Sequence, residues 1–198
     1  MGRKRVHDER LRERLLDVAG QRLVEQGLGG LSLRTLAADA DTSTAAVYSL
    51  FGGKPGLLSA LHERAFQRFG AGQAAVGTSD DPMEDVVRLG LAYRASAIAD
   101  PQGYQIMFGG EILPDHVGPR QLEAAAGTFL PLLAAVRRCV DEGYFRRDMP
   151  AESIATALWA NVHGLVSLEL GGALPPQAGP PADVFEAAAR AAVRGWSR

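Results

Sequence analysis

Helical spacing of apolar residues is the sequence feature that most restricts the fold of this chain. Apolar side chains recur every three or four positions along nearly its whole length, and glycine, proline or small capping residues separate the runs. The first run, residues 8–26, carries Leu11, Leu15 and Leu23 on one face and ends before Gly27. No segment reads as a convincing β-strand. The pattern therefore predicts an all-α protein of about nine helices.

The later helices are expected at positions set by these breaks. They are residues 33–38, 44–51, 54–77, 83–99, 102–108, 120–142, about 150–171 and about 183–196. Pro131 lies inside one of them and removes a backbone hydrogen bond, so that helix is expected to be split or bent. Residues 109–119 contain prolines and glycines without helical spacing and are expected to be irregular and mobile.

Composition limits the class of protein. Apolar residues make up 46% of the 198 residues and charged residues 22%, which is typical of globular proteins of one large or two small domains. There is no apolar run of membrane-spanning length, and the charged residues 1–5 do not resemble a signal peptide. The expected location is cytoplasmic, with no membrane partner. Cys139 is the single cysteine and forms no intramolecular disulfide.

Charge is distributed unevenly along the chain. The formal net charge is −2, but residues 1–55 carry nine lysines and arginines against seven acidic residues, whereas residues 56–198 carry twelve against sixteen. Only the N-terminal part favours phosphate groups, because binding to nucleic acid depends on local charge. The alternative is an ordinary solvated basic tail.

Residues 32–51 have the pattern of a helix-turn-helix, two short helices joined by a tight turn. Many such helix pairs never touch DNA, so the side chains must decide. On the second helix, Thr44, Tyr48 and Ser49 offer hydroxyl groups, and small alanines allow close approach. Arg34 and Lys54 are candidate phosphate or guanine contacts, or are simply solvated.

The ordered combination of residues 31–37, 43–51 and 54–57 resembles the DNA-binding domain of TetR-family regulators over about residues 8–60. The resemblance implies a three-helix helix-turn-helix domain, residues 1–55, whose recognition helix begins near Ser43. The DNA-binding residues expected on this basis, completed by the flanking serines, are Arg34, Ser43, Thr44, Ala45, Tyr48, Ser49 and Lys54. Residues 49–50 and 52–53 depart from the commonest family pattern, which leaves base preference open.

A second resemblance covers residues 157–166, which are similar to the Trp/His-Gly motif of one TetR C-terminal subgroup. It implies that residues 56–198 form a helical ligand-binding and dimerisation domain. The homodimer is expected through the last two helices, residues 150–171 and 183–197. Trp159 and His163 are four residues apart and share a helix face, so their rings can pack together.

A small-molecule effector of unknown identity is expected to bind among apolar residues with few polar groups. The candidates for its pocket are Tyr93, Tyr104, Met107, Phe108, Glu111, Phe129, Trp159 and His163. Each apolar candidate can instead be an ordinary core residue that contacts no ligand. Glu111 can be a solvated carboxylate, and His163 can be a hydrogen-bonded interior histidine. No catalytic, cofactor or metal motif is found, so no enzyme is expected.

These observations predict a ligand-responsive regulator, expected to be a repressor, that binds palindromic double-stranded operator DNA as a homodimer and leaves it when the effector binds. One rival is a helical ligand-binding protein or enzyme without sequence-specific DNA binding. A second rival is an activator, or an architectural DNA-binding protein that responds to no ligand.

Overall fold

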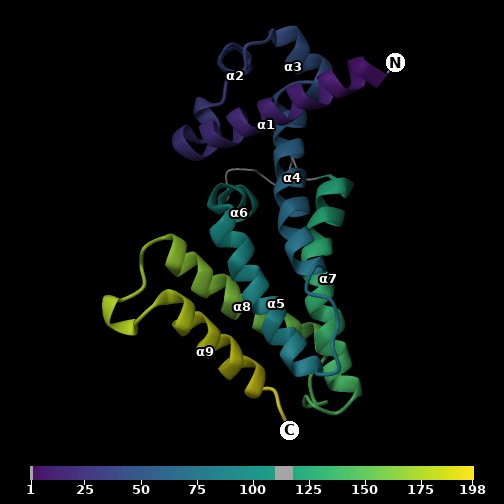
Figure 1. Ribbon diagram of the computed structural model, residues 1–198, viewed down its shortest axis with the longest axis vertical. Coiled ribbons are helices and arrows are strands. Elements are labelled where there is room, and N and C mark those ends of the chain that lie inside the picture. Colours follow the sequence, from purple (N-terminus) through teal and green to yellow (C-terminus); the bar gives the residue numbers. More distant parts are fainter. Residues whose placement is uncertain (1, 110–117) are drawn as a thin grey trace. The chain divides into compact units, whose positions relative to one another are not determined.

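The structure, a computed structural model, describes residues 2–109 and 118–198 (Figure 1). Within these ranges the chain forms nine α-helices and no β-strand, which confirms the all-α prediction. The helices are α1 (Gly2–Gly30), α2 (Leu33–Asp39), α3 (Thr44–Phe51), α4 (Lys54–Ala74), α5 (Pro82–Ala99), α6 (Pro101–Phe108), α7 (Pro119–Asp141), α8 (Ala151–Leu170) and α9 (Pro181–Arg194). The expected mobile segment, residues 109–119, lies mostly outside the described residues.

Several helix ends differ from the expected positions; α1, for example, begins at Gly2 and not at residue 8, and two of the differences involve glycine geometry. The helical pattern breaks at Gly27, where φ is 67° and ψ is −177°, but helical structure resumes and α1 continues to Gly30. Helix α4 ends at Ala74, before Gly77, because Gly77 adopts a left-handed conformation with φ of 66°.

Helix α7 is a single helix of 23 residues with Pro131 inside it, so the expectation of a split at this proline is wrong. Packing on the C-terminal side of the proline explains its continuity, because Leu133, Val136 and Cys139 are buried in a common core. That burial offsets the missing backbone hydrogen bond. The alternative, a bend at Pro131, stays a prediction.

The chain divides into two compact units. Unit 1 contains residues 1–68 and 102–125, and unit 2 contains residues 69–101 and 126–198. Helices α4 and α7 each begin in unit 1 and end in unit 2. Compactness alone does not say which part binds DNA, so the domain boundary after residue 55 stays a prediction.

The N-terminal core of unit 1 is built from α1, α2 and α3, which pack against one another. Leu15, Leu16, Leu36 and Val47 are fully buried there. These are the apolar positions that the helical spacing places on the inner face of each helix. Their burial holds two helices of only seven and eight residues, which are too short to be stable alone.

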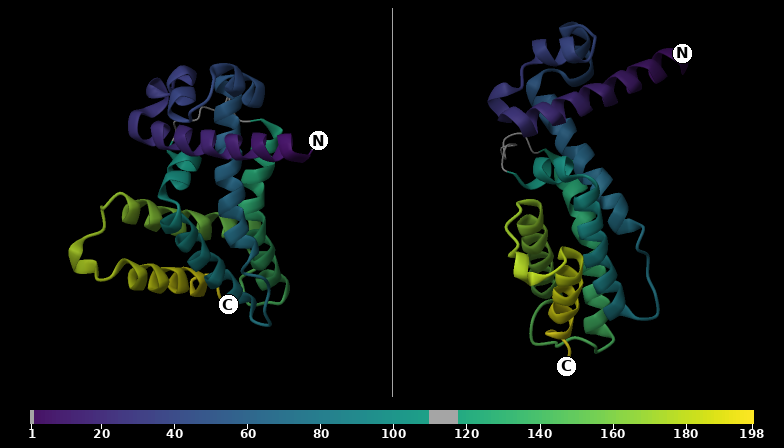
Figure 2. Two further views of the ribbon diagram at one scale, coloured as in Figure 1. Left: turned by 45° about the horizontal axis from the view of Figure 1, so that its top comes forward. Right: turned by 60° about the vertical axis from the view of Figure 1, so that its left-hand side comes forward.

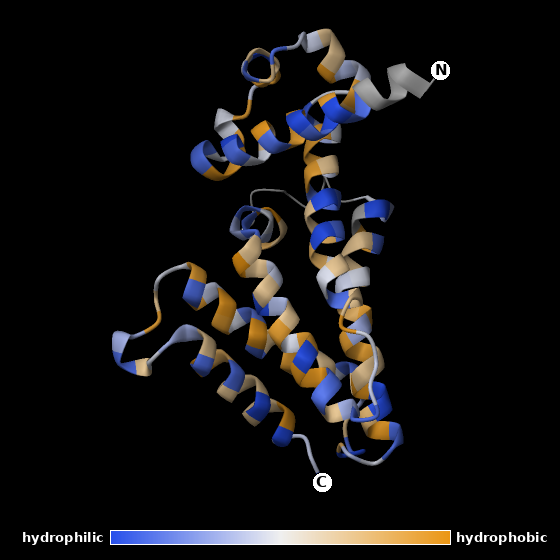
Figure 3. Cartoon of the chain, viewed as in Figure 1, coloured by the Kyte–Doolittle hydropathy of each residue, from blue (hydrophilic) through white to orange (hydrophobic). Residues whose placement is uncertain are grey.

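Unit 2 is built around α5, α8 and α9, which pack against one another. The further views show α8 and α9 running antiparallel side by side (Figure 2). Helix α8 is the more hydrophobic of the two, and α9 alternates apolar and polar residues (Figure 3). The core of this unit includes Val86, Phe145, Ile154 and Leu158.

A buried carboxylate ties the start of α5 to α7. Asp85 is 1% exposed and accepts hydrogen bonds from the backbone nitrogen (2.9 Å) and hydroxyl (2.7 Å) of Ser79. Arg88 and Arg138 each approach it to 3.3 Å. Burial raises the pKa of Asp85, but the Ser79 hydrogen bonds and the two arginines outweigh burial and hold it below its ordinary value. The sequence did not single out this residue.

Asp85→Asn is expected to lower the free energy of unfolding by about 3 kcal/mol at pH 7, because the arginines lose a buried charged partner. Since the pKa of Asp85 is lower in the folded chain, its ionised form stabilises the fold fully above about pH 4 and progressively less as the pH falls through the folded pKa. Urea unfolding at several pH values measures both effects. The exposed Asp141→Asn is the control, with an expected change within about 0.5 kcal/mol. Equal stability of Asp85→Asn and the unchanged protein would contradict this role.

Candidate nucleic-acid interface

Helix α3 starts at a capped, solvent-exposed N-terminus. Ser43 has extended backbone geometry, and its Oγ accepts a hydrogen bond from the backbone nitrogen of Ala46 at 3.2 Å. This is the N-cap arrangement that serine favours. In contrast, the Ser32 side chain makes no capping bond to α2, where Thr35 donates instead to the Ser32 carbonyl at 3.0 Å. Of these two helices, only α3 therefore has a side-chain cap.

Neighbouring residues of α3 differ sharply in exposure. Val47 is fully buried, whereas Tyr48 is 59% exposed. Thr44, Ala45 and Ser49 are also exposed. Because residues three and four apart share a helix face, these four exposed residues form one continuous surface, here named the α3 face. It presents hydroxyl groups and a tyrosine ring to solvent.

The turn from α3 to α4 depends on glycine. Gly52 and Gly53 have φ values of 71° and 125°, which other residues rarely adopt. A β-carbon at Gly56 would lie 1.8 Å from the backbone oxygen of Phe51, far inside contact distance. Glycines at residues 52–53 therefore suit the backbone geometry of this turn.

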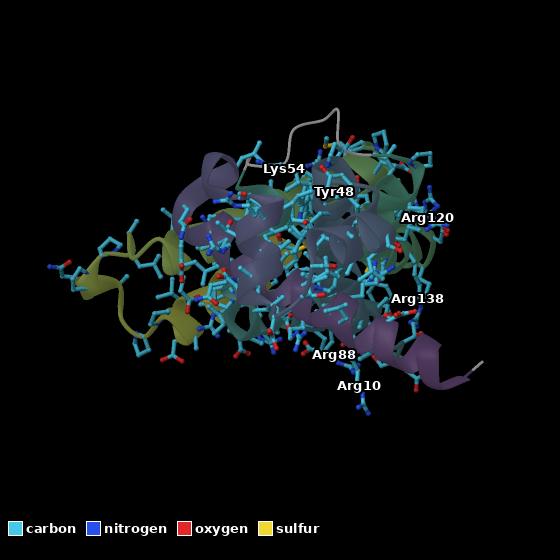
Figure 4. The ribbon with its side chains drawn as sticks, turned by 90° about the horizontal axis from the view of Figure 1, so that it is seen from above. Arg10, Tyr48, Lys54, Arg88, Arg120 and Arg138 are labelled. Carbon is cyan, nitrogen blue, oxygen red and sulfur yellow. The ribbon has the colours of Figure 1, made fainter. Side chains whose placement is uncertain are left out.

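The predicted phosphate contacts differ in their surroundings. Arg34 on α2 is exposed. Lys54 is half-buried, and its Nζ donates to the backbone oxygen of Leu28 at 2.7 Å, which ties the start of α4 to the end of α1. Figure 4 views the molecule from the side of these helices and labels Tyr48, Lys54 and Arg10. Lys54 therefore has a structural role, and its remaining ammonium protons can donate to a phosphate.

Other cations of unit 1 are engaged within the protein. Arg64 donates to Asp17 at 2.7 Å, and the Arg12 guanidinium lies 5.8 Å from the centre of the Phe51 ring. Arg22 pairs with Asp39. Several basic side chains of this unit therefore hold helices together.

The sequence-predicted ligand residues fall into two groups. Tyr93, Phe129, Trp159 and His163 belong to unit 2, and Tyr104, Met107 and Phe108 belong to unit 1. Glu111 lies outside the described residues. The candidates therefore form two separate sets of possible pocket residues, one in each unit.

The unit 2 group is a connected aromatic cluster. The Tyr93 hydroxyl and His163 Nδ1 are 3.1 Å apart, within hydrogen-bond distance. The Trp159 ring centre lies 5.8 Å from that of His163 and 6.1 Å from that of Phe129. Burial lowers the pKa of His163, which favours the neutral ring. The expected packing of Trp159 on His163 is present.

The unit 1 group lies beside a histidine that the sequence analysis did not select. Phe108 packs on Tyr104 at 5.0 Å between ring centres and on Phe66 at 5.9 Å. His62 meets Phe66 edge-on at 4.7 Å, and its buried Nδ1 has no hydrogen-bond partner in the described structure. Burial lowers the pKa of His62 as well. The i, i+4 spacing of His62 and Phe66 was the only sequence signal for this cluster.

Neither a metal site nor a membrane-spanning helix is found within residues 2–109 and 118–198. No group of histidine, cysteine, aspartate or glutamate side chains is placed to hold a metal ion. No helix in these ranges combines the length and hydrophobicity needed to cross a membrane.

Comparison with known families decides the identity of this architecture. The profile of bacterial regulatory proteins of the tetR family matches residues 15–61, which contain the α3 face. The profile of the tetracyclin repressor-like C-terminal domain matches residues 86–192, more than half of the chain. The chain belongs to the TetR family of transcriptional regulators. Its helix-turn-helix is thus a DNA-binding element.

Individual proteins align with this regulator over nearly its whole length. It is 25% identical to the HTH-type transcriptional regulator Rv1816 of Mycobacterium tuberculosis, an alignment that covers 87% of this chain and 86% of the relative. A protein of unknown function from Rhodococcus sp. RHA1 superposes with a TM-score of 0.81 and 29% identity over 95% of this chain and 96% of its own. The regulator PfmR of Thermus thermophilus has the same fold, with a TM-score of 0.73 and 22% identity over 93% and 100% of the two chains.

Gly56→Ala is expected to displace the α3–α4 turn, because its methyl group would overlap the Phe51 carbonyl. The free energy of unfolding should fall by about 1–3 kcal/mol, measured by urea denaturation. The control is Gly127→Ala in α7, where nothing lies within 4 Å of the new carbon. That change should stabilise the helix by about 0.5–1 kcal/mol. Similar effects of the two substitutions would contradict the steric account.

Proposed function

We propose that this regulator is a ligand-responsive repressor that binds near-palindromic operator DNA as a homodimer. The observation that carries the proposal is the α3 face, whose hydroxyl groups and tyrosine point to solvent while Val47 anchors the helix. Membership of a family of transcriptional regulators supports it. The protein would act in the cytoplasm, where bacterial operator DNA lies.

The DNA contacts divide by chemistry. Thr44, Ala45, Tyr48 and Ser49 would meet base edges and thymine methyl groups when α3 lies in the major groove. The Ser43 hydroxyl already accepts a bond from the helix, so its proton is left to donate to a phosphate oxygen. Exposed Arg34 and the ammonium of Lys54 would neutralise phosphates and fix the register.

The dimer would form through α8 and α9, as the family resemblance implies. On α8, a shallow groove is lined by small or short side chains and one carboxylate, namely Glu152, Ser153, Thr156, Ala157 and Ala160. Leu168 near the end of the helix is 46% exposed, which is high for a leucine. Small side chains let helices approach closely, so this face suits a four-helix contact with the same face of a second copy.

A two-fold dimer would place two α3 helices in successive major grooves about 34–36 Å apart, which requires a nearly palindromic operator. Effector binding would favour a conformer in which this spacing is lost. The shift in DNA affinity can be no larger than the difference in effector affinity between the two conformers. Helix α4 would transmit it, since it runs from Lys54 near the α3 face into unit 2.

A mobility-shift assay with the DNA flanking the gene tests the proposal, with and without candidate effectors. A repressor of this kind retards a fragment containing the operator and releases it when the effector is added. A helical ligand-binding protein or enzyme leaves the DNA unshifted. A regulator that responds to no ligand never releases it, and reporter transcription separates repression from activation.

Tyr48→Ala is expected to weaken operator binding by about tenfold, because a hydrogen bond and the ring contact at the groove are lost. Fluorescence anisotropy with labelled operator DNA measures the affinity. The melting temperature should barely change, since the side chain is mostly exposed. Tyr144→Ala is the matched control, because Tyr144 is 44% exposed in unit 2. Unchanged affinity of Tyr48→Ala would remove this residue from the interface.

Ala157→Glu is expected to convert the dimer to a monomer, because a two-fold interface would bring the new carboxylate and its mate together without compensating cations. Light scattering after size-exclusion chromatography measures the mass. Ala134→Glu on α7 is the control, since Ala134 is also an exposed helical alanine. A dimer that persists in Ala157→Glu would place the interface elsewhere.

A further inference from the structure

Two histidines of this chain lie in aromatic clusters, and they differ in their hydrogen bonds. In unit 2, His163 Nδ1 is already 3.1 Å from the Tyr93 hydroxyl. In unit 1, His62 is 8% exposed and its Nδ1 has no partner within the described part of the chain. The more deeply buried ring is therefore the one with unmet hydrogen-bonding capacity.

An unpartnered buried nitrogen lowers stability, because the atom has given up water without gaining another bond. The ring that contacts His62 is apolar: Phe66 meets it edge-on, with ring centres 4.7 Å apart. Phenylalanine would fill such a place with no buried polar atom. The imidazole at residue 62 therefore has no evident packing advantage, which points to a partner that is not part of the fold.

We propose that His62 is the polar anchor of the effector site, and that the effector is a small aromatic molecule with a hydroxyl group. This inference rests on the proposed ligand-responsive function and names the residue and the ligand chemistry. It replaces His163 as the polar group that the ligand meets. The apolar walls would come from Phe66 on α4 and from Tyr104 and Phe108 on α6.

The hydroxyl group and the aromatic ring of the ligand are each inferred from side chains around His62. A hydroxyl group both donates and accepts, so it can satisfy Nδ1 in either tautomer of the ring. Because burial lowers the pKa of His62, the ring is neutral near pH 7 and offers no charge to an anionic ligand. An aromatic guest is favoured because Phe66, Tyr104 and Phe108 already pack with tilted or edge-to-face rings, a geometry that another ring can join.

Occupation of this site would act directly on the helix-turn-helix. The rings of Phe66 and Phe108 are in contact, with centres 5.9 Å apart, so a guest between them must move α6 away from α4. Helix α6 also packs on α1, where a β-carbon at Gly20 would lie 3.4 Å from Cδ1 of Ile106. All of these contacts lie within unit 1. A ligand that selects the separated conformer would thus shift the helices that hold α3.

The test compares phenol with toluene, which have nearly the same shape but differ in the hydroxyl group. Their binding to the full-length protein is measured by ligand-dependent shifts in melting temperature, without DNA. The ratio of the two dissociation constants is then compared between the unchanged protein and His62→Phe. The proposal predicts that this substitution moves the ratio about tenfold in favour of toluene.

His62→Phe should melt no lower than the unchanged protein, because it removes a buried unsatisfied atom. If it fails to fold, His62→Leu carries the same comparison, because leucine also offers no hydrogen bond to the hydroxyl group. An unchanged ratio in the variant that folds, or no binding of phenol to the unchanged protein, would overturn the proposal. So would a loss of phenol preference in His163→Phe but not in His62→Phe. Operator binding by ligand-free protein is measured separately, so failure here leaves the DNA-binding proposal intact.

Discussion

Burial of Val47 against the first two helices sets the orientation of α3, and the remaining features of the DNA-binding unit depend on that orientation. With Val47 fully buried, the geometry of a helix places Ala45 and Ser49 on the opposite side, next to the exposed Tyr48. The helix has only eight residues, so its position must be fixed at both ends. Ser43 caps the start, and two glycines with positive φ allow the sharp exit into α4.

Buried polar residues can be divided by whether their hydrogen-bonding atoms have partners within the protein. Asp85 is buried with hydrogen bonds and two arginines around it, which marks it as part of the framework. His163 has Tyr93 as its partner. His62 alone among these has a buried atom without a partner in the described structure, and it lies on α4, one of the two helices that begin in unit 1 and end in unit 2.

The sequence predicted the helices and the α3 face because both depend on local patterns. Helical spacing predicted the short helix 44–51, and the hydroxyl groups of Thr44, Tyr48 and Ser49 marked its exposed surface as a candidate for DNA contact. It missed Asp85 and His62, since their roles come from neighbours distant in the chain, such as Arg138 and Phe108. The split that was one of two alternatives expected at Pro131 does not occur, because tertiary burial offset the local effect of proline. The DNA contacts stay predictions.

Dimethyl sulfate footprinting on an operator fragment tests the central claim most directly, because the reagent methylates guanine N7 in the major groove and adenine N3 in the minor groove. If the α3 face enters the major groove from both subunits, the protein will protect guanine N7 in two patches about one helical turn apart, related by two-fold symmetry. Protection confined to adenine N3, or none on a fragment that the protein binds specifically, would contradict the account.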